Sequence, residues 1–552
     1  MAPTVRGSGA GRTGAPLALR LAILLIGLIC TLPILAVGLA SVWAPSDTVG
    51  HLASTVLPRY AGNTVGLVAV VGLASAAIGV STAWLVTMAQ FPGRRMFEIA
   101  LVLPFAFPAY VLAFAYTHVL DHPGIVQTTL RSITGWGPRD YWFPEIRSFG
   151  GAATMMTFVL YPYVYLLARA AFRTQSAAQF IAARSLGKGN WFVFMTISLP
   201  MARAAIAGGM LLVAMETIAD FGTVAYFSVQ TFATGIYQSW FAMADRAAAA
   251  QLALCLLSFA LLLAGLERLS RRGQSVGGSK TMVAQPVFHL TGWRAVGAVT
   301  VCALPVLIGA VIPTIALSFM AFGSEQDLLS PRYVRFIQNS VTLSSVAAGL
   351  TVVAALVIGT GTRLYPTTAN KTAGHIARLG YAVPGGVIAV GLLVPFAALD
   401  NAIDAVMESW FDINTGLLLT GSIWVLVLAY MTRFMAAALG AYEGGIANIN
   451  PNLDSASRVL GRNTFSTVAR VHVPLLSPSL LTAALIVFVD VMKELPATMI
   501  MRPFNYDTLA VQAYRLASDE RLEGAAVPSL VIAAIGLVPT ILLCMKVAQG
   551  RR

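Results

Sequence analysis

Two stretches of the chain carry the same pattern and decide its fold. The first reads Ile181-Ala-Ala-Arg-Ser-Leu-Gly187 and, after nine intervening residues, Ile197-Ser-Leu199-Pro200. The second reads Ser455-Ala-Ser-Arg-Val-Leu-Gly461 and, again after nine, Val471-His-Val473-Pro474. The interval from Gly187 to Gly461 equals the interval from Pro200 to Pro474, and we call it the repeat offset. The repeated pattern predicts a duplicated structural unit.

Other matches keep nearly the same spacing along the chain. Asn63 matches Asn339 and Pro108 matches Pro384, and these two intervals are equal to each other. We expect a first repeat over 1–266 with its motif at 181–200, and a second over 293–552 with its motif at 455–474. The segment 267–292 between them is polar, Gly-rich and basic, which is typical of a flexible cytoplasmic linker.

The composition places both repeats in a membrane. Hydrophobic residues make up 57% and charged residues 11%, whereas a soluble globular protein carries roughly 25% charged residues. A helix needs about 20 mostly apolar residues to cross the hydrocarbon core. By this length, the sequence predicts an all-α integral membrane protein of about twelve spans, six in each repeat. The predicted spans are 17–43, 63–89, 96–118, 148–172, 198–222, 247–266, 293–322, 340–362, 376–398, 415–440, 475–499 and 525–547.

The basic residues predict the orientation of these spans. With the N-terminus placed in the cytoplasm, 25 of the 36 Lys and Arg residues fall in inside segments and 10 in outside segments. This bias favours both termini in the cytoplasm. The net charge of +13 then reflects cytoplasmic loops that face anionic lipid, and we expect no nucleic-acid partner.

At this point the residues resemble a known family. The pattern Ala-Ala-x-x-x-Gly, nine residues, then Ile-x-Leu-Pro is similar to the cytoplasmic coupling motif of binding-protein-dependent ABC importer permeases. The resemblance covers essentially the whole chain, with both halves fused. Ile181 and Ser455 stand where the family has Glu, which weakens a salt bridge to the ATPase from that position. The matching positions, which the resemblance implies couple to the ATPase, are Ala182, Ala183, Gly187, Pro200, Ala456, Gly461 and Pro474.

The resemblance implies the type I permease architecture in a bacterial inner membrane. It implies two copies of an ABC ATPase at the cytoplasmic face, with ATP and Mg on those subunits, and an extracytoplasmic substrate-binding protein. The chain itself has no nucleotide site, so we expect neither an enzyme nor a bound cofactor: in the stretch 273–281, Ser279 rather than Gly precedes Lys280.

The substrate is suggested by a stretch of the second repeat. The segment 492–498, Met-Lys-Glu-Leu-Pro-Ala-Thr, and the segment 502–511 that follows are similar to ferric-iron permeases. Thiamine permeases share the fused architecture and remain an alternative. An ion-coupled secondary transporter is the alternative from a different class, because such proteins also often have twelve spans in two repeats. A membrane-embedded enzyme, based on the cluster around His118, is a third alternative.

Paired carboxylates mark a candidate pathway or gate. Glu216 and Asp220 are four residues apart near the end of one predicted span, and Asp490 and Glu494 match them at the repeat offset. We expect each pair to share one helix face. Four carboxylates near one axis would suit a hard cation, whereas Lys493 beside Glu494 would equally explain the second pair as a local ion pair.

A weaker candidate for metal binding lies at the outer end of the third predicted span. His118, Asp121 and His122 are spaced so that one helical turn could present three metal donors together. A polar helix end at the membrane interface gives the same spacing. The remaining histidines, including His375 and His472, form no constellation in the sequence.

Overall fold

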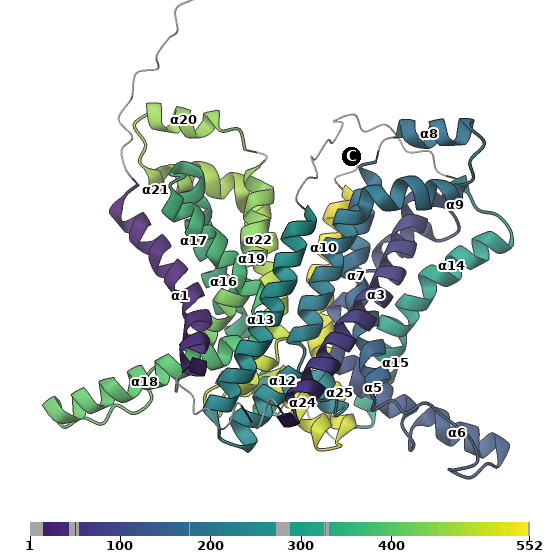
Figure 1. Cartoon of the computed structure of the whole chain (residues 1–552), viewed down its shortest axis with the longest axis horizontal. Coiled ribbons are helices and arrows are strands. Elements are labelled where there is room, and N and C mark those ends of the chain that lie inside the picture. The colour runs from purple at the N-terminus through teal and green to yellow at the C-terminus, as the bar shows by residue number, and fades with distance from the viewer. Residues whose placement is uncertain are drawn as a thin grey trace, which may run out of the picture. The chain divides into compact units, whose positions relative to one another are not determined.

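The computed structural model describes residues 15–42, 50, 54–175, 177–271, 288–324, 326, 330–447 and 449–549, which are mostly helical (Figure 1). The first predicted repeat contains α1 (Leu17–Val42), α3 (Leu57–Met88), β1 (Ala89–Gln90), α4 (Arg94–Ala100), η1 (Leu103–Ala106), α5 (Ala109–Leu120), α6 (Ile125–Thr134), α7 (Phe149–Arg173), α8 (Ala177–Ser185), α9 (Asn190–Val193), η2 (Phe194–Ser198), α10 (Leu199–Ala219), α11 (Gly222–Tyr226), α12 (Phe232–Tyr237), η3 (Gln238–Ala242) and α13 (Arg246–Arg271).

The second predicted repeat has a similar order of elements. It contains β2 (Phe288–His289), α14 (Trp293–Val306), η4 (Leu307–Val311), α15 (Ile312–Phe322), α16 (Pro331–Leu364), α17 (Thr368–Leu379), η5 (Gly380–Ala382), α18 (Gly385–Phe411), α19 (Ile423–Ile446), α20 (Asn452–Val459), α21 (Thr464–Thr467), η6 (Val468–His472), α22 (Val473–Met492), α23 (Pro496–Met501), α24 (Leu509–Ser518) and α25 (Leu522–Gln549). Of the predicted linker, residues 272–287 lie outside the described residues.

The structure confirms an all-α membrane fold with two tandem sets of spans. Within the described residues, eleven helical runs are long and apolar enough to cross a membrane. A bent pair, 94–106 and 109–134, makes a twelfth. The predicted spans 17–43 and 293–322 match the observed runs Leu17–Val42 and Trp293–Phe322 closely.

The third predicted span, 96–118, is wrong as a continuous helix. The chain bends by 92° between η1 and α5. Phe107 is extended with φ −94° and ψ 132°, because a residue that precedes proline avoids the helical region. Pro108, also extended, then begins α5.

The ninth predicted span, 376–398, is also wrong as a continuous helix, and its break lies at Pro384, which matches Pro108. The helix α17 ends at Leu379, and a separate helix α18 starts after Pro384, whose φ and ψ are −58° and 146°. Pro108 has −64° and 147°. The two matched prolines therefore break the two repeats in the same conformation.

The duplication is also visible in the element boundaries. The helix α9, the π-helical turn η2 and the start of α10 recur, one repeat offset later, as α21, the π-helical turn η6 and the start of α22. These runs begin at Asn190 and Thr464, earlier than the predicted limits of 198 and 475. A π-helical turn continues the helical path up to the proline, which then occupies the first turn of the next helix.

The described residues form two compact units that do not follow the repeat boundaries. One lies within 1–32, 345–381 and 430–488, and the other within 33–344, 382–429 and 489–552. In the first unit, the start of α1 lies against the second repeat: a Cβ at Gly27 would lie 3.5 Å from the Cβ of Ala373. The first span of the first repeat therefore helps to bury the core of the second.

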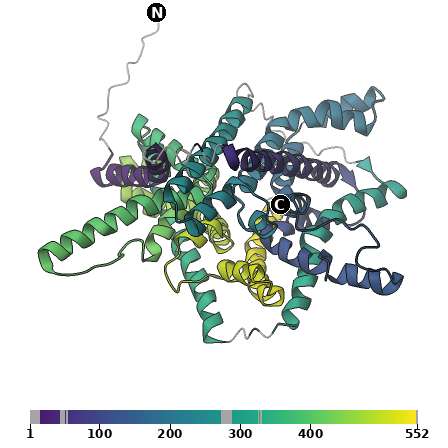
Figure 2. The ribbon, with the colours of Figure 1, turned by 60° about the horizontal axis from the view of Figure 1, so that its bottom comes forward.

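The second unit shows the reciprocal arrangement. Its helix α14 contacts α3 and α4 of the first repeat (Figure 2). The strand β2 pairs in parallel with β1, with Ala89 opposite Phe288. The Tyr116 hydroxyl also donates to the carbonyl of Ile308 at 2.8 Å. The first span of the second repeat is thus fixed to the first repeat.

Candidate functional site

The first copy of the predicted coupling motif begins within the short helix α8, which ends as the sequence predicts. Gly187 follows the helix with φ +75°, a left-handed conformation that favours glycine. The Lys188 amide donates back to the Ala183 carbonyl at 3.0 Å. This bond, from the residue after the left-handed glycine, is the six-to-one bond of a Schellman cap.

The second copy ends in the same way. Gly461 has φ +70°, and the Arg462 amide donates to the Ser457 carbonyl at 3.1 Å. A side chain at either glycine would meet no atom within 4 Å. The requirement for glycine is therefore conformational rather than steric. Pro200 and Pro474 follow as the second residues of α10 and α22.

Both short helices present the same positions outward. Ala182 and Ala456 are exposed, whereas Ala183 and Ser457 are buried. Beside each helix, large apolar side chains are open to the surroundings, among them Ile181, Leu186, Trp191, Val459, Leu460 and Phe465. Apolar surface of this kind marks a contact site for another protein or a membrane.

A groove runs beside the first of these helices. It encloses about 940 Å³ and is bordered by Ala182, Ala183, Leu186, Phe192 and Pro200, with the basic side chains of Lys188 and Arg203 also on its lining. The coupling positions predicted in the first repeat thus lie on one surface, apart from Gly187, which ends the helix.

The inner face of α8 is held by aromatic side chains. Phe180 is 4% exposed, and its ring centroid lies 6.4 Å from that of Trp84 in α3. Phe194 and Phe172 lie 4.9 Å and 5.5 Å from the same ring. These ring contacts are apolar and include no charge-assisted hydrogen bond.

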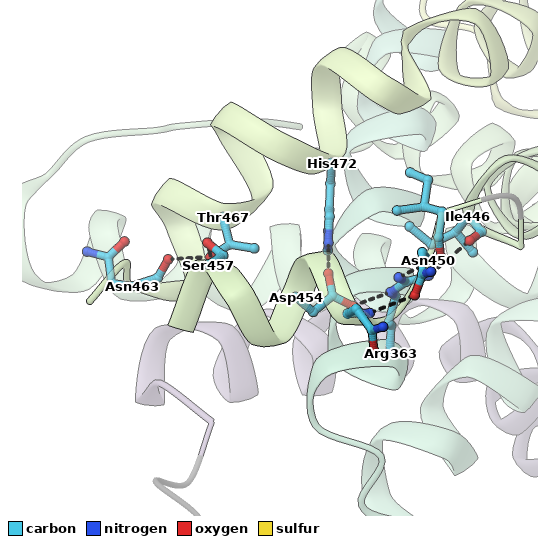
Figure 3. Close-up of polar contacts among 10 residues, drawn as sticks. Arg363, Ile446, Asn450, Asp454, Ser457, Asn463, Thr467 and His472 are labelled. Carbon is cyan, nitrogen blue, oxygen red and sulfur yellow. Dashed lines mark hydrogen bonds and ion pairs between the residues drawn. The ribbon is translucent and has the colours of Figure 1, made fainter. Parts of the chain in front are cut away.

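The inner face of α20 is held by charged groups (Figure 3). Asp454, 5% exposed, accepts at Oδ2 from Nε of Arg363 at 2.7 Å. Its Oδ1 lies 2.7 Å from Nε2 of His472, which is 0% exposed. A carboxylate can only accept, so Nε2 carries the proton of this bond. The sequence places His472 in no constellation, and this prediction is wrong because His472 pairs with Asp454.

The electrostatics of this cluster favour an ionised Asp454. Burial by itself raises the pKa of the carboxyl, but the hydrogen bonds from His472 and Arg363 and their charges outweigh it. The pKa of Asp454 is therefore held below its ordinary value.

The predicted span that carries Glu216 and Asp220 ends earlier than its predicted limit of 222. The helix α10 ends at Ala219, between the two carboxylates. Asp220 instead caps α11: Oδ1 accepts from the amides of Thr223 at 2.9 Å and Val224 at 3.3 Å. Its Oδ2 accepts from the Thr223 hydroxyl at 2.9 Å.

The second pair also lies at the end of a helix. The helix α22 ends at Met492, and Glu494 caps α23, which begins at Pro496. Oε1 accepts from the Ala497 amide at 3.0 Å, and Oε2 from the amide and hydroxyl of Thr498 at 3.1 Å and 2.9 Å. The repeat offset thus relates two carboxylates that each accept hydrogen bonds from the start of the next helix.

The remaining carboxylate of the second pair is neutralised locally. Asp490 Oδ1 lies 3.0 Å from Nζ of Lys493. The same ammonium lies 4.3 Å from the ring centroid of Phe105. The local ion pair that Lys493 suggests in the sequence is therefore present.

The two capped turns meet at Tyr110 of α5. A Cβ at Gly222 would lie 2.9 Å both from Leu495 Cδ2 and from Tyr110 Cβ. Tyr110 is buried, at 4% exposure. Its buried hydroxyl has no hydrogen-bond partner among the described residues. The start of α11 and the start of α23, one from each repeat, are thus in contact.

The structure does not bring His118, Asp121 and His122 together as metal ligands. In the part of the chain that the structure describes, no three His, Cys, Asp or Glu side chains could hold a metal ion. Asp121 instead pairs through Oδ2 with Nε of Arg147 at 3.0 Å. The polar helix end that the sequence offers as the alternative is the arrangement found.

Arg147 links this helix end to Glu520, which lies between α24 and α25. Its Nη1 and Nη2 donate to the two carboxylate oxygens of Glu520 at 2.6 Å and 2.8 Å. This bidentate bond holds the pKa of Glu520 below its ordinary value. Neither Arg147 nor Glu520 carries a sequence signal that could identify it, because 373 residues separate them.

Comparison with known proteins agrees with this arrangement. Residues 351–548 match the model of the family described as binding-protein-dependent transport system inner membrane component. The Fe(3+)-transport system permease protein FbpB 2 of Haemophilus influenzae is 25% identical over 96% of this chain and 98% of its own length.

Two further relatives differ in what their names say they carry. The ferric transport system permease protein FbpB of Actinobacillus pleuropneumoniae is 24% identical over 86% of this chain and 69% of its own length. The molybdenum transport system permease protein ModB of Escherichia coli is 28% identical over 35% of this chain and 83% of its own length. Residues 351–548 thus match the binding-protein-dependent transport family, and the chain is similar over nearly its whole length to a permease of an Fe(3+)-transport system.

Proposed function

We propose that this chain carries ferric iron into the cytoplasm as the membrane subunit of an ATP-driven importer. One relative that matches nearly the full length, and a second that covers 86% of this chain, are named as ferric-iron transport permeases, which supports iron as the substrate. An extracytoplasmic binding protein delivers the substrate in this proposal.

The helices α8 and α20 each receive one copy of a separate ATPase subunit, which binds ATP and Mg. The observation that carries this step is the pair of exposed short helices, each ended by a left-handed glycine at the matching position of its repeat. Closure of the ATPase pair on ATP moves the two helices, and the connected spans then open the pathway to alternate sides of the membrane.

Both termini and the linker 267–292 lie in the cytoplasm in this proposal, with repeats over 1–266 and 293–552. The bias of Lys and Arg toward the same side supports this orientation.

The capped turns at Asp220 and Glu494 act as part of the outer gate rather than as an ion-binding site. Three hydrogen bonds to each carboxylate already occupy its oxygens. The contact between the turns at Tyr110 gives them a shared surface that can part when the repeats move.

The test is uptake into vesicles that contain the chain with its ATPase and binding protein. We expect ATP-dependent uptake of Fe³⁺, with little uptake of thiamine or molybdate under the same conditions. Thiamine or molybdate uptake in place of iron would assign another substrate to the same machinery. Uptake driven by an ion gradient without ATPase would instead establish a secondary transporter.

A further inference from the structure

The second coupling helix is tied to three other elements through one guanidinium. Arg363, near the end of α16, donates through Nη1 to the carbonyl of Ile446, the last residue of α19, at 2.9 Å. Its Nη2 donates to the Ile449 carbonyl at 3.0 Å and its Nε to Asp454 of α20 at 2.7 Å. One side chain therefore fixes the end of a span, the connecting loop and the coupling helix (Figure 3).

Asp454 extends this connection to the next span. Its Oδ1 is hydrogen-bonded to Nε2 of His472, which is the last residue of the π-helical turn η6 before α22. The coupling helix also contacts this turn region through Ser457, whose hydroxyl lies 2.8 Å from that of Thr467. The hydrogen bonds of Asp454 to Arg363 and His472 are charge-assisted, and such bonds are directional and resist displacement.

Among the described residues, the first repeat has no charged connection at the equivalent positions; there the Ser198 carbonyl accepts from the Gln175 side chain at 2.9 Å. At the repeat offset, Phe180 stands in the place of Asp454 and Ser198 in the place of His472. Phe180 lies against Trp84 in an aromatic cluster. The two coupling helices are thus anchored by different chemistry, one apolar and one ionic.

We propose that Arg363, Asp454 and His472 are positioning residues that make α20 move as one body with α16, α19 and α22 when its ATPase closes. The inference rests on the proposed docking of an ATPase at α20. The ionic anchor transmits displacement of α20 to three spans at once, whereas the aromatic anchor of α8 allows that helix to shift relative to its spans.

The experiment compares Asp454→Asn with wild type in vesicles that hold the ATPase and the binding protein. Three quantities are measured: inserted permease, ATPase affinity, and iron taken up per ATP hydrolysed. We expect iron uptake per ATP to fall at least fivefold, while ATPase affinity stays within about twofold. Arg363→Lys keeps the charge but loses the planar fork that reaches two carbonyls, so it should show the same loss.

Asp400→Asn is the matched control. Asp400 is also buried, at 1% exposure, and accepts from the amides of Leu419 and Thr420 at 2.8 Å. It lies on α18 and makes none of the contacts of the anchor. We expect this variant to keep uptake per ATP even if less protein is inserted.

An unchanged uptake per ATP in both Asp454→Asn and Arg363→Lys would overturn the proposal. So would an equal loss in Asp400→Asn, because burial of any carboxylate would then account for the effect. Loss of ATPase affinity in Asp454→Asn, without loss of uptake per bound ATPase, would also overturn it. If wild-type permease binds no ATPase at α20, the proposed function fails first, and the affinity measurement reveals this separately.

Discussion

The left-handed glycines that end the coupling helices offer a graded perturbation. At Gly187 and Gly461, φ is +75° and +70°, and the space around each Cβ position is empty. A substitution therefore changes backbone energy without creating a clash. An alanine in this region costs about 1–2 kcal/mol, while asparagine tolerates it better because its side chain bonds locally.

This energy translates directly into ATPase affinity if the cap holds each helix in its docking conformation. A cost of about 1–2 kcal/mol shifts a two-state equilibrium by roughly 5- to 30-fold. We therefore expect Gly187→Ala and Gly461→Ala to weaken ATPase binding by about that factor, and the matched Gly→Asn variants to weaken it much less.

The assay is titration of the ATPase onto permease in lipid nanodiscs, with inserted protein quantified for each variant. Equal affinity for the glycine, asparagine and alanine forms at both sites would refute the reasoning. An equal loss for asparagine and alanine would also contradict it, because the backbone conformation would then not be the cause.

Three further outcomes follow from the anchors and caps. Asp220→Ala should lower the free energy of unfolding by about 1 kcal/mol more than Asp220→Asn, since asparagine still caps α11; equal thermal melts would contradict the capping role. Phe180→Ala should destabilise the protein by about 3–5 kcal/mol, because a buried ring leaves the Trp84 cluster; an unchanged melting temperature would count against the aromatic anchor. The depressed pKa of Asp454 predicts a stabilising contribution that is complete above the unfolded-state pKa of about 3.9 and lost as the pH falls through the folded-state value. The difference in melting temperature between wild type and Asp454→Asn should therefore shrink below about pH 4, and a difference that grows there would reverse the assignment.

The sequence predicts the features that depend on local chemistry or on repetition. Gly187 and Gly461 end their helices because glycine alone adopts the left-handed conformation without cost. The repeat offset is reproduced in α9, η2 and α10 and their counterparts. Hydropathy finds the spans because each must cross the same thickness of lipid.

Breaks inside apolar runs are harder to place. The bend before Pro108 carries a proline signal, because the preceding Phe107 avoids the helical region. The end of α22 also lies shortly before a proline, Pro496, although Leu495 stays in the helical region. Hydropathy continues across these prolines, so length alone joins separate helices. At the matching end of α10 no proline stands, and the local signals are Asp220 and Gly222.

The ionic anchor could not be predicted because its partners are far apart in the chain. Arg363 and Asp454 are separated by 91 residues, and Asp454 and His472 by 18. A signal does exist at Asp454 itself: it lies three residues before Ser457, on the inward face of a short amphipathic helix. A carboxylate on a buried face needs a partner, but the sequence does not say which.

Cross-linking at the coupling helices tests the central claim most directly. In a background without the native cysteines, cysteine is placed at exposed Ala182 or Ala456, with buried Ala183 and Ser457 as matched controls. With ATPase and ATP present, the two exposed positions should each cross-link to an ATPase subunit, and the buried positions should not. Failure of both exposed positions to react, in permease that still takes up iron with ATP, would contradict the account.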